Sequence, residues 1–531
     1  MSLDAVGLEV MGHAFVSIAE EMGLVLIHSA VSPNIRERRD CSAALFDADG
    51  ELIAQAAHIP VHLGALAESV AAVRALHPPP RGGELFLLND PYTGGSHLPD
   101  LTVIGAIAGE DGAGGTRLAG FSVVRAHHSD VGGVQAGSMP AGAREIFAEG
   151  VVVPAVRFTP EVERFLLANV RTPAARAADL AAQRAAVERG ADGLRALAAR
   201  YGWADTRAAA RDLMAYAERR TREALRPFEA TGLVATDWLE GDGVDDVDLP
   251  IVVRVDVRDG VFHADFAGTA PAARGNVNCP LAVARSAVLF VVRTLVPEDV
   301  PTNGGVSRAV HVTAPEGCLV NARSPSAVAA GNVETSQRIA DTVFRALAAG
   351  GVTVTAQGQG TMNNVTFGGQ RATGNVQPGG AVAAGWTYYE TVGGGQGASR
   401  GATGPSGVHV GMSNTRNTPI EVLEMEYPLR LKAYALRRSS GGLGQWVGGE
   451  GVIREFAALA PIELSVLAER RRHAPRGAAG GGPGALGRTV LNGTALAPKV
   501  STLLQPGDVL RIETPGGGGW GGGEPERGGE P

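Results

Sequence analysis

The segment from residue 159 to residue 228 has an almost wholly helical pattern, whereas the chain on both sides of it shows the patterns of strands and turns. Leu180, Val187, Leu194 and Tyr201 recur at spacings that keep them on one helical face. Arginine and glutamate fill the positions between them, as on a face turned to solvent. A helical packing segment set between strand-bearing segments predicts an α+β fold for this chain.

The change of pattern along the chain predicts a mixed, multi-domain organisation. Glycine makes up 74 of the 531 residues, about twice its average share, and most of it lies in the second half. Tight turns between strands are therefore expected there. The expected parts are an α+β domain at 1–158, a helical segment at 159–235, an α+β segment at 236–350, a β-rich segment at 351–523 and a frayed tail at 524–531.

Individual elements follow from periodicity and turn signals. The N-terminal part predicts helices at 10–32 and 63–76 and a hairpin at 41–55. The middle part predicts strands at 251–257 and 261–266 and helices at 284–295 and 336–349. Strands are also expected at 84–88 and 121–124.

The charge balance excludes some classes of function. The net charge is −8, which argues against a duplex nucleic-acid binder because such a protein needs a basic face. The basic clusters Arg36–Arg39 and Arg470–Arg472 are expected to be solvated or to form internal ion pairs. No basic-then-apolar leader opens the sequence, and no stretch is expected to span a membrane. Three widely spaced cysteines without a paired motif fit a reducing compartment, so a cytoplasmic location is expected.

Two short polar clusters, at 89–100 and 126–133, each follow an apolar run that is typical of a strand. Turn-rich segments at strand ends are where a rigid scaffold presents reactive groups. His97 and Asp100 can converge across the tight turn that Pro99 favours, and His127 can supply a third ligand. Two imidazoles and a carboxylate leave positions open on a divalent ion, as a catalytic metal requires. From spacing alone, a metal site and a purely structural role both remain open.

Other chemistries find less support. The only two lysines, Lys432 and Lys499, do not follow a glycine, so no nucleotide-binding P-loop is present. The glycine-rich stretch 393–401 lacks the strand and helix that a dinucleotide loop or a serine nucleophile elbow requires. Cys41 follows basic residues, but a small buried side chain is the favoured interpretation.

The combined motifs resemble the hydantoinase B family, which includes the B subunits of N-methylhydantoinases, the C-terminal half of 5-oxoprolinases and the alpha subunits of acetone-type carboxylases. The resemblance covers nearly the whole chain. Beyond the two polar clusters, it includes Ser138-Met139-Pro140, Asn169-Val170-Arg171-x-Pro173, Gly275-Asn276-Val277-Asn278, Asn414-Thr415-Arg416-Asn417-Thr418-Pro419, Glu469-Arg470-Arg471 and the closing glycine run.

The resemblance implies a divalent metal (manganese, iron or zinc) bound by His97, Asp100 and His127. It favours His127 over His128 as a ligand. Asp90 is then expected to support the ligands or contact the substrate, and with His128 and Asp130 it completes the expected catalytic set. The family often has a histidine where this chain has Gly411, so any role of that histidine is lost here.

The resemblance also implies a division of labour with a hydantoinase A-like, actin-like ATPase subunit, which phosphorylates a carbonyl-derived oxygen. The leading hypothesis is the B subunit of an ATP-dependent enzyme that hydrolyses a hydantoin- or oxoproline-like lactam as a hetero-oligomer. The first alternative is the alpha subunit of a carboxylase acting on a ketone. The second is a catalytically silent scaffold for the ATPase subunit.

Overall fold

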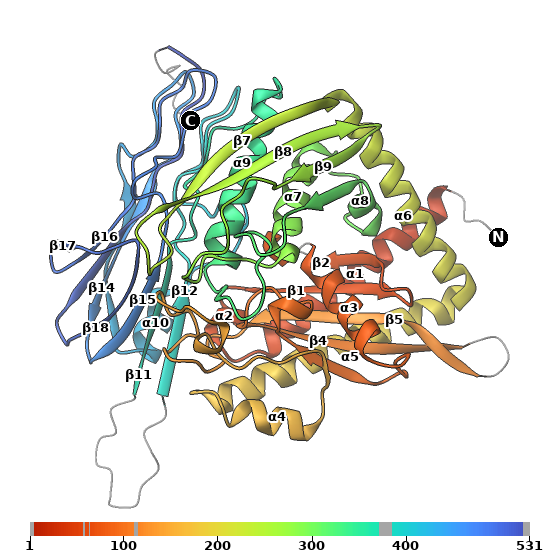
Figure 1. Cartoon of the computed structure of the whole chain (residues 1–531). Coiled ribbons are helices and arrows are strands. Elements are labelled where there is room, and N and C mark those ends of the chain that lie inside the picture. Colours follow the sequence, from red (N-terminus) through yellow and green to blue (C-terminus); the bar gives the residue numbers. More distant parts are fainter. Residues whose placement is uncertain (1–4, 57–58, 63, 111–114, 371–384, 524–531) are drawn as a thin grey trace, which may run out of the picture.

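The structure is a computed structural model that describes residues 5–56, 59–62, 64–110, 115–370 and 385–523. Helices and several sheets share the chain, which confirms the α+β prediction (Figure 1). The tail expected at 524–531 lies outside the described residues. The sequence also places two histidines, His58 and His62, on a short segment upstream of the polar clusters, and of these His58 lies outside the described residues.

The N-terminal part is built on a six-stranded sheet in the order β2-β1-β5-β4-β3-β6, in which every neighbouring pair is antiparallel. The expected hairpin at 41–55 forms its β1–β2 edge. The strands are β1 (Cys41–Asp47), β2 (Leu52–Ala56), β3 (Leu85–Leu88), β4 (Asp100–Glu110), β5 (Thr116–His127) and β6 (Val156–Arg157).

Helices cover both faces of this sheet because the strand residues alternate between two apolar cores. One core joins Leu101 and Val124 to helices α1 (Ala5–Ser29) and α5 (Pro173–Tyr201). The other joins Ile104 and Val123 to α3 (Ala65–Leu76). Shorter or flanking elements are α2 (Pro33–Arg36), η1 (Pro60–His62), η2 (Pro91–Thr93), η3 (Ile146–Ala148), α4 (Pro160–Leu167), α6 (Trp203–Leu225) and η4 (Arg226–Phe228).

A four-stranded sheet and a pair of long helices form the middle part. The order is β10-β9-β8-β7, and β10 pairs with β9 in parallel. Helices α7 and α9 pack on it around a large apolar core. The elements are β7 (Ala230–Glu240), β8 (Asp248–Arg258), β9 (Val261–Asp265), α7 (Leu281–Leu295), α8 (Gly304–Arg308), β10 (Val310–Thr313), the π-helical turn η5 (Gly331–Thr335) and α9 (Ser336–Ala349).

Two further sheets share one core in the C-terminal part, on the left in Figure 1. The first, in the order β12-β11-β15-β18, contains β11 (Asn364–Gln370), β12 (Gly385–Glu390), β15 (Ile462–Leu467) and β18 (Lys499–Leu504). The second, in the order β13-β14-β19-β16-β17, contains β13 (Leu429–Arg437), β14 (Gly451–Ala458), β16 (Arg488–Leu491), β17 (Thr494–Ala495) and β19 (Val509–Glu513). Helix α10 (Ile420–Glu426) interrupts an otherwise strand-rich segment.

The closing glycine run packs backbone against backbone. A Cβ on Gly517 would lie 2.0 Å from the carbonyl oxygen of Gln396, so no side chain fits there. The dinucleotide-like stretch around Gln396 is therefore a packed loop beside the C-terminal run, as its sequence context predicts.

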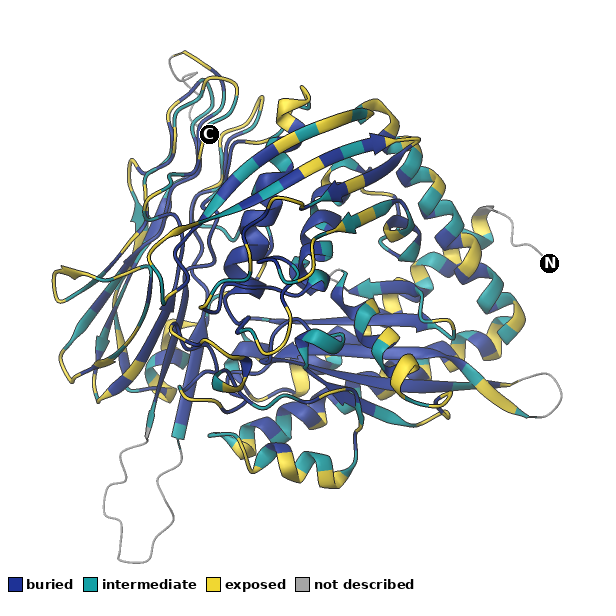
Figure 2. Cartoon of the chain, in the orientation of Figure 1, coloured by how far each residue is buried: buried dark blue, intermediate teal, exposed yellow. Residues whose placement is uncertain are grey.

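Helix α1 is long and apolar enough to cross a membrane by length and composition alone. Phe15, Met22 and Leu26 lie on its buried face and join the core shared with α5 and the sheet. Its other face is exposed, so buried and exposed positions alternate around the helix (Figure 2). This packing is typical of a core helix.

Candidate metal centre

The ends of two neighbouring strands bring Asp100 and His127 together. Asp100 opens β4 and His127 closes β5, and the antiparallel register places them directly across from each other. His97 precedes Asp100 in a tight turn through Pro99, where the Asp100 N–H donates to the His97 carbonyl at 3.1 Å. Asp100 and His127 thus come from paired strand ends of one sheet, and His97 comes from the turn that leads into it.

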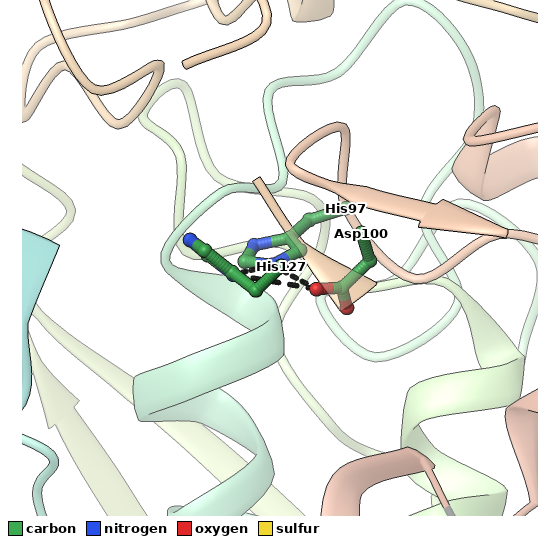
Figure 3. A group of neighbouring side chains, drawn as sticks. All are labelled: His97, Asp100 and His127. Carbon is green, nitrogen blue, oxygen red and sulfur yellow. Dashed lines mark hydrogen bonds and ion pairs between the residues drawn. The ribbon is translucent and has the colours of Figure 1, made fainter. Parts of the chain in front are cut away.

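The ligand atoms of these residues converge on one point (Figure 3). Asp100 Oδ1 lies 3.2 Å from His97 Nε2 and 3.3 Å from His127 Nδ1, and the two nitrogens are 3.2 Å apart. Ligands bound about 2.0–2.2 Å from a divalent ion are about 3.0–3.4 Å from one another. The triangle therefore fits one face of a metal's coordination sphere.

The burial of the three side chains and an Asp100 oxygen that accepts no hydrogen bond support the same interpretation. Side-chain exposure is 0% for His97, 1% for Asp100 and 3% for His127. Within the described part of the chain, Asp100 Oδ1 accepts no hydrogen bond. A buried carboxylate oxygen without a donor is costly, and a cation held by the three residues removes that cost. The donor set is thus suited to a divalent ion.

The second oxygen of Asp100 is held by several donors. Asp100 Oδ2 accepts from Ser96 Oγ at 2.5 Å and from Asn332 Nδ2 at 3.3 Å. His62 Nε2 lies 3.4 Å away, and His62 Nδ1 is 3.0 Å from the Ser42 hydroxyl. If Ser42 donates to Nδ1, the neutral ring carries its proton on Nε2, facing the carboxylate. Asp100 is thereby oriented so that Oδ1 is left for the ligand triangle.

A backbone carbonyl fixes the orientation of His97. His97 Nδ1 lies 3.2 Å from the Ala329 oxygen, which can only accept, so this nitrogen carries the proton and Nε2 keeps its lone pair. The buried Glu149 carboxylate accepts from the N–H groups of Val328 and Ala329 at 2.9 and 2.8 Å. Glu149 thus anchors the segment that orients His97, although burial raises the pKa of Glu149 to about 8.

The pKa directions of Asp100 and His127 suit metal binding. Burial alone would raise the pKa of Asp100, but His97, His62 and His127 together hold it well below its usual value. Burial lowers the pKa of His127. Burial also disfavours the charged form of His97, yet Asp100 outweighs it and raises the pKa of His97. An ionised carboxylate beside a neutral His127 is the state that binds a cation.

A small cavity adjoins the centre. Its volume is about 20 Å³, enough for one water molecule or ion. His127 stacks on Tyr389, with ring centroids 4.5 Å apart and planes inclined by 17°. The lining residues are Asp40, Ile59, Val61, His62, Asp100, His127, Asn332, Val333, Met362, Tyr389, Thr391, Ser413 and Thr415. The cavity therefore lies where the N-terminal sheet meets η5 and the C-terminal part.

Asp90, for which the family resemblance implies a place in the catalytic set, lies outside the group formed by His97, Asp100 and His127. Its Oδ1 accepts from the Tyr92 N–H at 3.0 Å, and its Oδ2 accepts from the Thr93 hydroxyl at 2.9 Å. These contacts cap η2. Its geometry gives it a structural role in the turn that leads to His97.

His128 and Asp130 also lie outside the cavity lining. Successive strand residues point to opposite faces, and His128 Nε2 lies 2.9 Å from Gln183 Oε1 on α5. Asp130 forms an ion pair with Arg171 at 2.9 Å. Both side chains contact neighbouring structural elements, and their expected catalytic roles gain no support from this arrangement.

Several residues of the site carry no sequence signal of their own. Asn332, Tyr389 and Thr391 belong to no pattern that predicts a role, because tertiary packing alone brings them to the cavity. His62 could have been suspected from its chemistry, since histidine is a common metal ligand. It approaches Asp100 Oδ2 and is not part of the ligand triangle.

Gly411 occupies a position that accepts no larger residue without rearrangement. Its φ is +59°, and a Cβ there would lie 2.1 Å from Gln337 Oε1. Gln337 in turn donates to the Val410 carbonyl at 2.7 Å. The Gln337 amide thus occupies the space that a side chain at position 411 would need. In this chain, the glycine at 411 leaves that space to Gln337.

Comparison with protein families and curated proteins identifies relatives along the whole chain. The family described as Hydantoinase B/oxoprolinase matches residues 4–523. 5-Oxoprolinase 1 of Arabidopsis thaliana is 36% identical over 98% of this chain and 42% of its own length. A putative D-/L-hydantoinase B subunit of Pseudomonas sp. (strain NS671) is 30% identical over 98% of this chain and 90% of its own length. The chain therefore spans about two-fifths of that 5-oxoprolinase and most of the bacterial protein.

Two solved structures share the fold. The ATP-dependent caprolactamase from Pseudomonas jessenii has a TM-score of 0.87 and 27% identity, over 98% of this chain and 92% of its own. Nucleotide-free acetone carboxylase has a TM-score of 0.84 and 17% identity, over 97% of this chain and 75% of its own. The second likeness is one of fold alone.

Proposed function

Since the chain belongs to the hydantoinase B/oxoprolinase family, we propose that it is the metal-binding B subunit of an ATP-dependent cyclic amide hydrolase. The single observation that carries the proposal is the buried convergence of His97, Asp100 and His127 at 3.2–3.3 Å. A catalytically silent scaffold has no need for an unmatched buried carboxylate oxygen beside two imidazoles.

The proposed substrate is a lactam. The relatives whose names state an activity include an oxoprolinase, a hydantoinase component and a caprolactamase, and the substrates in these names are all cyclic amides. A B-type component implies an A-type partner, and the lack of a P-loop in this chain supports assigning ATP to that partner. We place this hetero-oligomer in the cytoplasm. Carboxylation of a ketone is less favoured, because only the fold is shared with acetone carboxylase.

His97, Asp100 and His127 would hold the divalent ion, which is manganese, iron or zinc in this proposal. When bound, such an ion polarises an acyl or phosphoryl oxygen and makes water a stronger nucleophile. Ser96, Asn332 and the Ser42–His62 pair keep the Asp100 carboxylate oriented.

Protein side chains also control what reaches the centre. Tyr389 covers one face of the His127 ring, and the small cavity leaves space for about one oxygen-sized group. Excluding bulk water strengthens the electrostatic interactions of the site and protects an activated intermediate. The partner is proposed to supply that intermediate by phosphorylating the amide oxygen.

Reconstitution tests this proposal. The chain is co-purified with an A-type ATPase and offered hydantoin, 5-oxoproline, caprolactam, or acetone together with bicarbonate, each with and without ATP. ATP-dependent ring opening of a lactam that is lost in His97→Ala is the expected result. Turnover of acetone alone would point to the carboxylase alternative, and wild-type turnover by His97→Ala with unchanged metal content would overturn the proposal.

A further inference from the structure

The six largest fully buried side chains of the described residues are arginines, and they fall into two classes. Four of them pair with carboxylates: Arg176 with Asp179, Arg338 with Glu469, Arg454 with Glu390 and Arg470 with Asp341. Arg38 and Arg125 instead donate their hydrogen bonds to neutral oxygens. A buried cation is normally paired, so these two exceptions call for an explanation.

The partners of Arg38 belong to the cavity beside the metal centre. Its NH2 group donates to Thr391 Oγ1 at 2.7 Å and to Thr415 Oγ1 at 3.3 Å. Both threonines line the cavity together with Asp100 and His127. Arg125 differs because its partners, Thr102 and Ser69, do not line it. Arg38 is thus neither solvated nor ion-paired, which corrects the expectation for this residue, whereas the exposed Arg36 pairs with Glu37 as expected.

The two threonine hydroxyls present a donor to the cavity. Their oxygens are 2.6 Å apart, so one hydroxyl donates to the other. Each hydroxyl has one proton, and Arg38 donates to both oxygens. One O–H of the pair therefore has its proton left for an acceptor in the cavity when His409 Nε2, the other candidate acceptor at 3.5 Å, carries a proton of its own. Thr391 is 1% exposed and Thr415 is 7% exposed, and bulk water does not fill that role.

His409 lies beside the two threonines and is uncharged. Its Nε2 lies 3.5 Å from Thr415 Oγ1, and its Nδ1 lies 3.1 Å from the Ser413 hydroxyl. Burial, reinforced by the Arg38 guanidinium, lowers the pKa of His409 to about 3. Arg38 is therefore the cation that polarises the threonine pair.

We propose that the Thr391–Thr415 pair, polarised by Arg38, binds the substrate oxygen that takes up negative charge when its acyl carbon is attacked. This inference rests on the proposed lactam hydrolysis and adds an oxyanion site to it. The cavity of about 20 Å³ matches a single oxygen atom. Prearranged donors in a buried site act strongly on developing charge because they need no reorganisation.

The electron balance needs no further reagent. Water adds to the acyl carbon of the O-phosphorylated lactam, and the C=N π pair moves onto the ring nitrogen, which takes a proton from that water. As the ring C–N bond breaks, its electron pair leaves with the nitrogen, which takes the second proton, and the new oxygen becomes the carbonyl oxygen of an acyl phosphate. A second water then adds to this carbonyl and the π pair moves onto the acyl oxygen, to which the threonine O–H donates; the pair returns to form the carboxylic acid as the C–O bond to phosphate breaks and phosphate leaves. The threonine protons remain in place throughout.

Conservative variants of the two threonines test the oxyanion site in the complex with the ATPase partner. Removing one oxyanion donor lowers kcat about 100-fold in comparable sites, so Thr415→Val and Thr391→Val are expected to lose about that factor. KM and metal content should stay unchanged. Thr415→Ser and Thr391→Ser restore the hydroxyl and should recover most of the rate.

The matched control is Thr342→Val on α9, because Thr342 is buried and its hydroxyl donates to the Arg338 carbonyl at 2.6 Å within its own helix. It should keep wild-type kcat. Wild-type kcat in both cavity variants, or loss of metal as the cause of a lower rate, would overturn the oxyanion site.

Fluoride binding provides a readout that does not depend on turnover. Fluoride is an anion of about the size of one oxygen, and calorimetry on the zinc-loaded chain measures its affinity. Thr415→Val should weaken it about tenfold or more, whereas Thr342→Val should not. Equal fluoride affinity in all three proteins would overturn the inference, even if no lactam is turned over and the proposed function itself fails.

Discussion

Two buried clusters of charged side chains in this molecule have opposite character. In the metal centre, Asp100 Oδ1 faces two imidazole nitrogens and accepts no hydrogen bond among the described residues. In the second cluster, between β7, α9 and the end of β15, Asp237 lies 3.6 Å from Arg470 and 3.8 Å from Arg338. There each carboxylate faces a permanent cation.

The charge-paired cluster extends well beyond one ion pair. Arg338 contacts Glu469 at 3.3 Å, and Glu469 also pairs with Lys499. Although burial alone would raise the pKa of Asp237, Arg470, Arg338 and Arg345 hold it far below its usual value. The carboxylates of Asp237, Asp341 and Glu469 each pair with a cation of the chain, and these pairs link the C-terminal part to the middle part.

Both clusters are buried and charged, so burial and charge do not by themselves identify a functional site. The distinguishing feature is an acceptor whose partner must come from outside the chain. Substitutions in the metal centre should therefore weaken metal binding. Substitutions in the charge-paired cluster around Asp237 should instead lower the free energy of unfolding.

The largest effect is expected for Asp100→Asn. The neutral amide is a poor metal ligand, so only the two imidazoles remain to hold the ion. Metal content should therefore fall below about a tenth of the wild-type value, and turnover should decrease about a thousandfold or more. Elemental analysis and coupled turnover measure both. Asp179→Asn, which alters a buried carboxylate paired with Arg176, should keep its metal, and equal metal loss in the two variants would break the comparison.

Asp237→Asn tests the charge-paired cluster. Removing one partner of a buried ion pair costs about 3–5 kcal/mol, so the free energy of unfolding at pH 7 should fall by about that amount with metal content unchanged. The surface variant Asp256→Asn, whose arginine neighbours are exposed, should cost less than about 1 kcal/mol. Similar losses in both variants would refute the assigned role of Asp237.

The pH dependence of that loss follows from the lowered pKa of Asp237. A carboxyl with a depressed folded-state pKa stabilises the fold above its ordinary value of 3.8, and this stabilisation is lost as the pH falls toward the lower folded-state value. Denaturant unfolding should show a constant gap between wild type and Asp237→Asn from pH 5 to pH 8. The gap should narrow below about pH 4, and a gap that widens there would contradict the assignment.

Ser42→Ala sharpens the comparison within the metal centre. His62 loses the donor to Nδ1, so its proton is no longer fixed toward Asp100. Loss of such a supporting contact weakens metal binding about 10- to 100-fold, which competition with a chelator measures. Ser122→Ala is the control, because Ser122 is buried in the same sheet and donates to the Val187 carbonyl at 2.8 Å. Unchanged metal affinity in Ser42→Ala would show that the hydrogen bond between Ser42 and His62 does not support the metal centre.

The smallest effect is expected for Tyr389→Phe. The hydroxyl donates to Asn364 Oδ1 at 2.8 Å, whereas the ring that stacks on His127 is retained. The loss should be about 1 kcal/mol of unfolding free energy, with metal affinity unchanged. Tyr434→Phe removes a hydrogen bond from an exposed tyrosine hydroxyl to an asparagine oxygen. It should lower the free energy of unfolding by less than Tyr389→Phe does. A large loss of metal in Tyr389→Phe would show that the hydroxyl, and not the ring, supports the centre.

The sequence was sufficient to predict that His97, Asp100 and His127 converge, because Asp100 and His127 lie at the ends of strands that pair directly and His97 lies in the tight turn before Asp100. Periodicity likewise located the main helices, α1, α5, α7 and α9.

Other parts of the site depend on tertiary contacts that local patterns do not encode. Tyr389 and Thr415 reach the cavity from the C-terminal part, and Arg38 is buried although its cluster has the composition of a surface segment. Asp90 has the chemistry of a catalytic acid, but its turn uses both carboxylate oxygens. Residue type and spacing predict candidate ligands, whereas packing decides which of them remain available.

The proposed function requires that His97, in the turn before β4, and Asp100 and His127, at paired strand ends, hold a single divalent ion. Anomalous diffraction from crystals of the metal-supplemented chain tests it most directly. We expect one ion per chain, bound by Asp100 Oδ1, His97 Nε2 and His127 Nδ1 at about 2.0–2.2 Å. A fully supplemented crystal with no ion at these atoms, or with its ion at another site, would contradict the account.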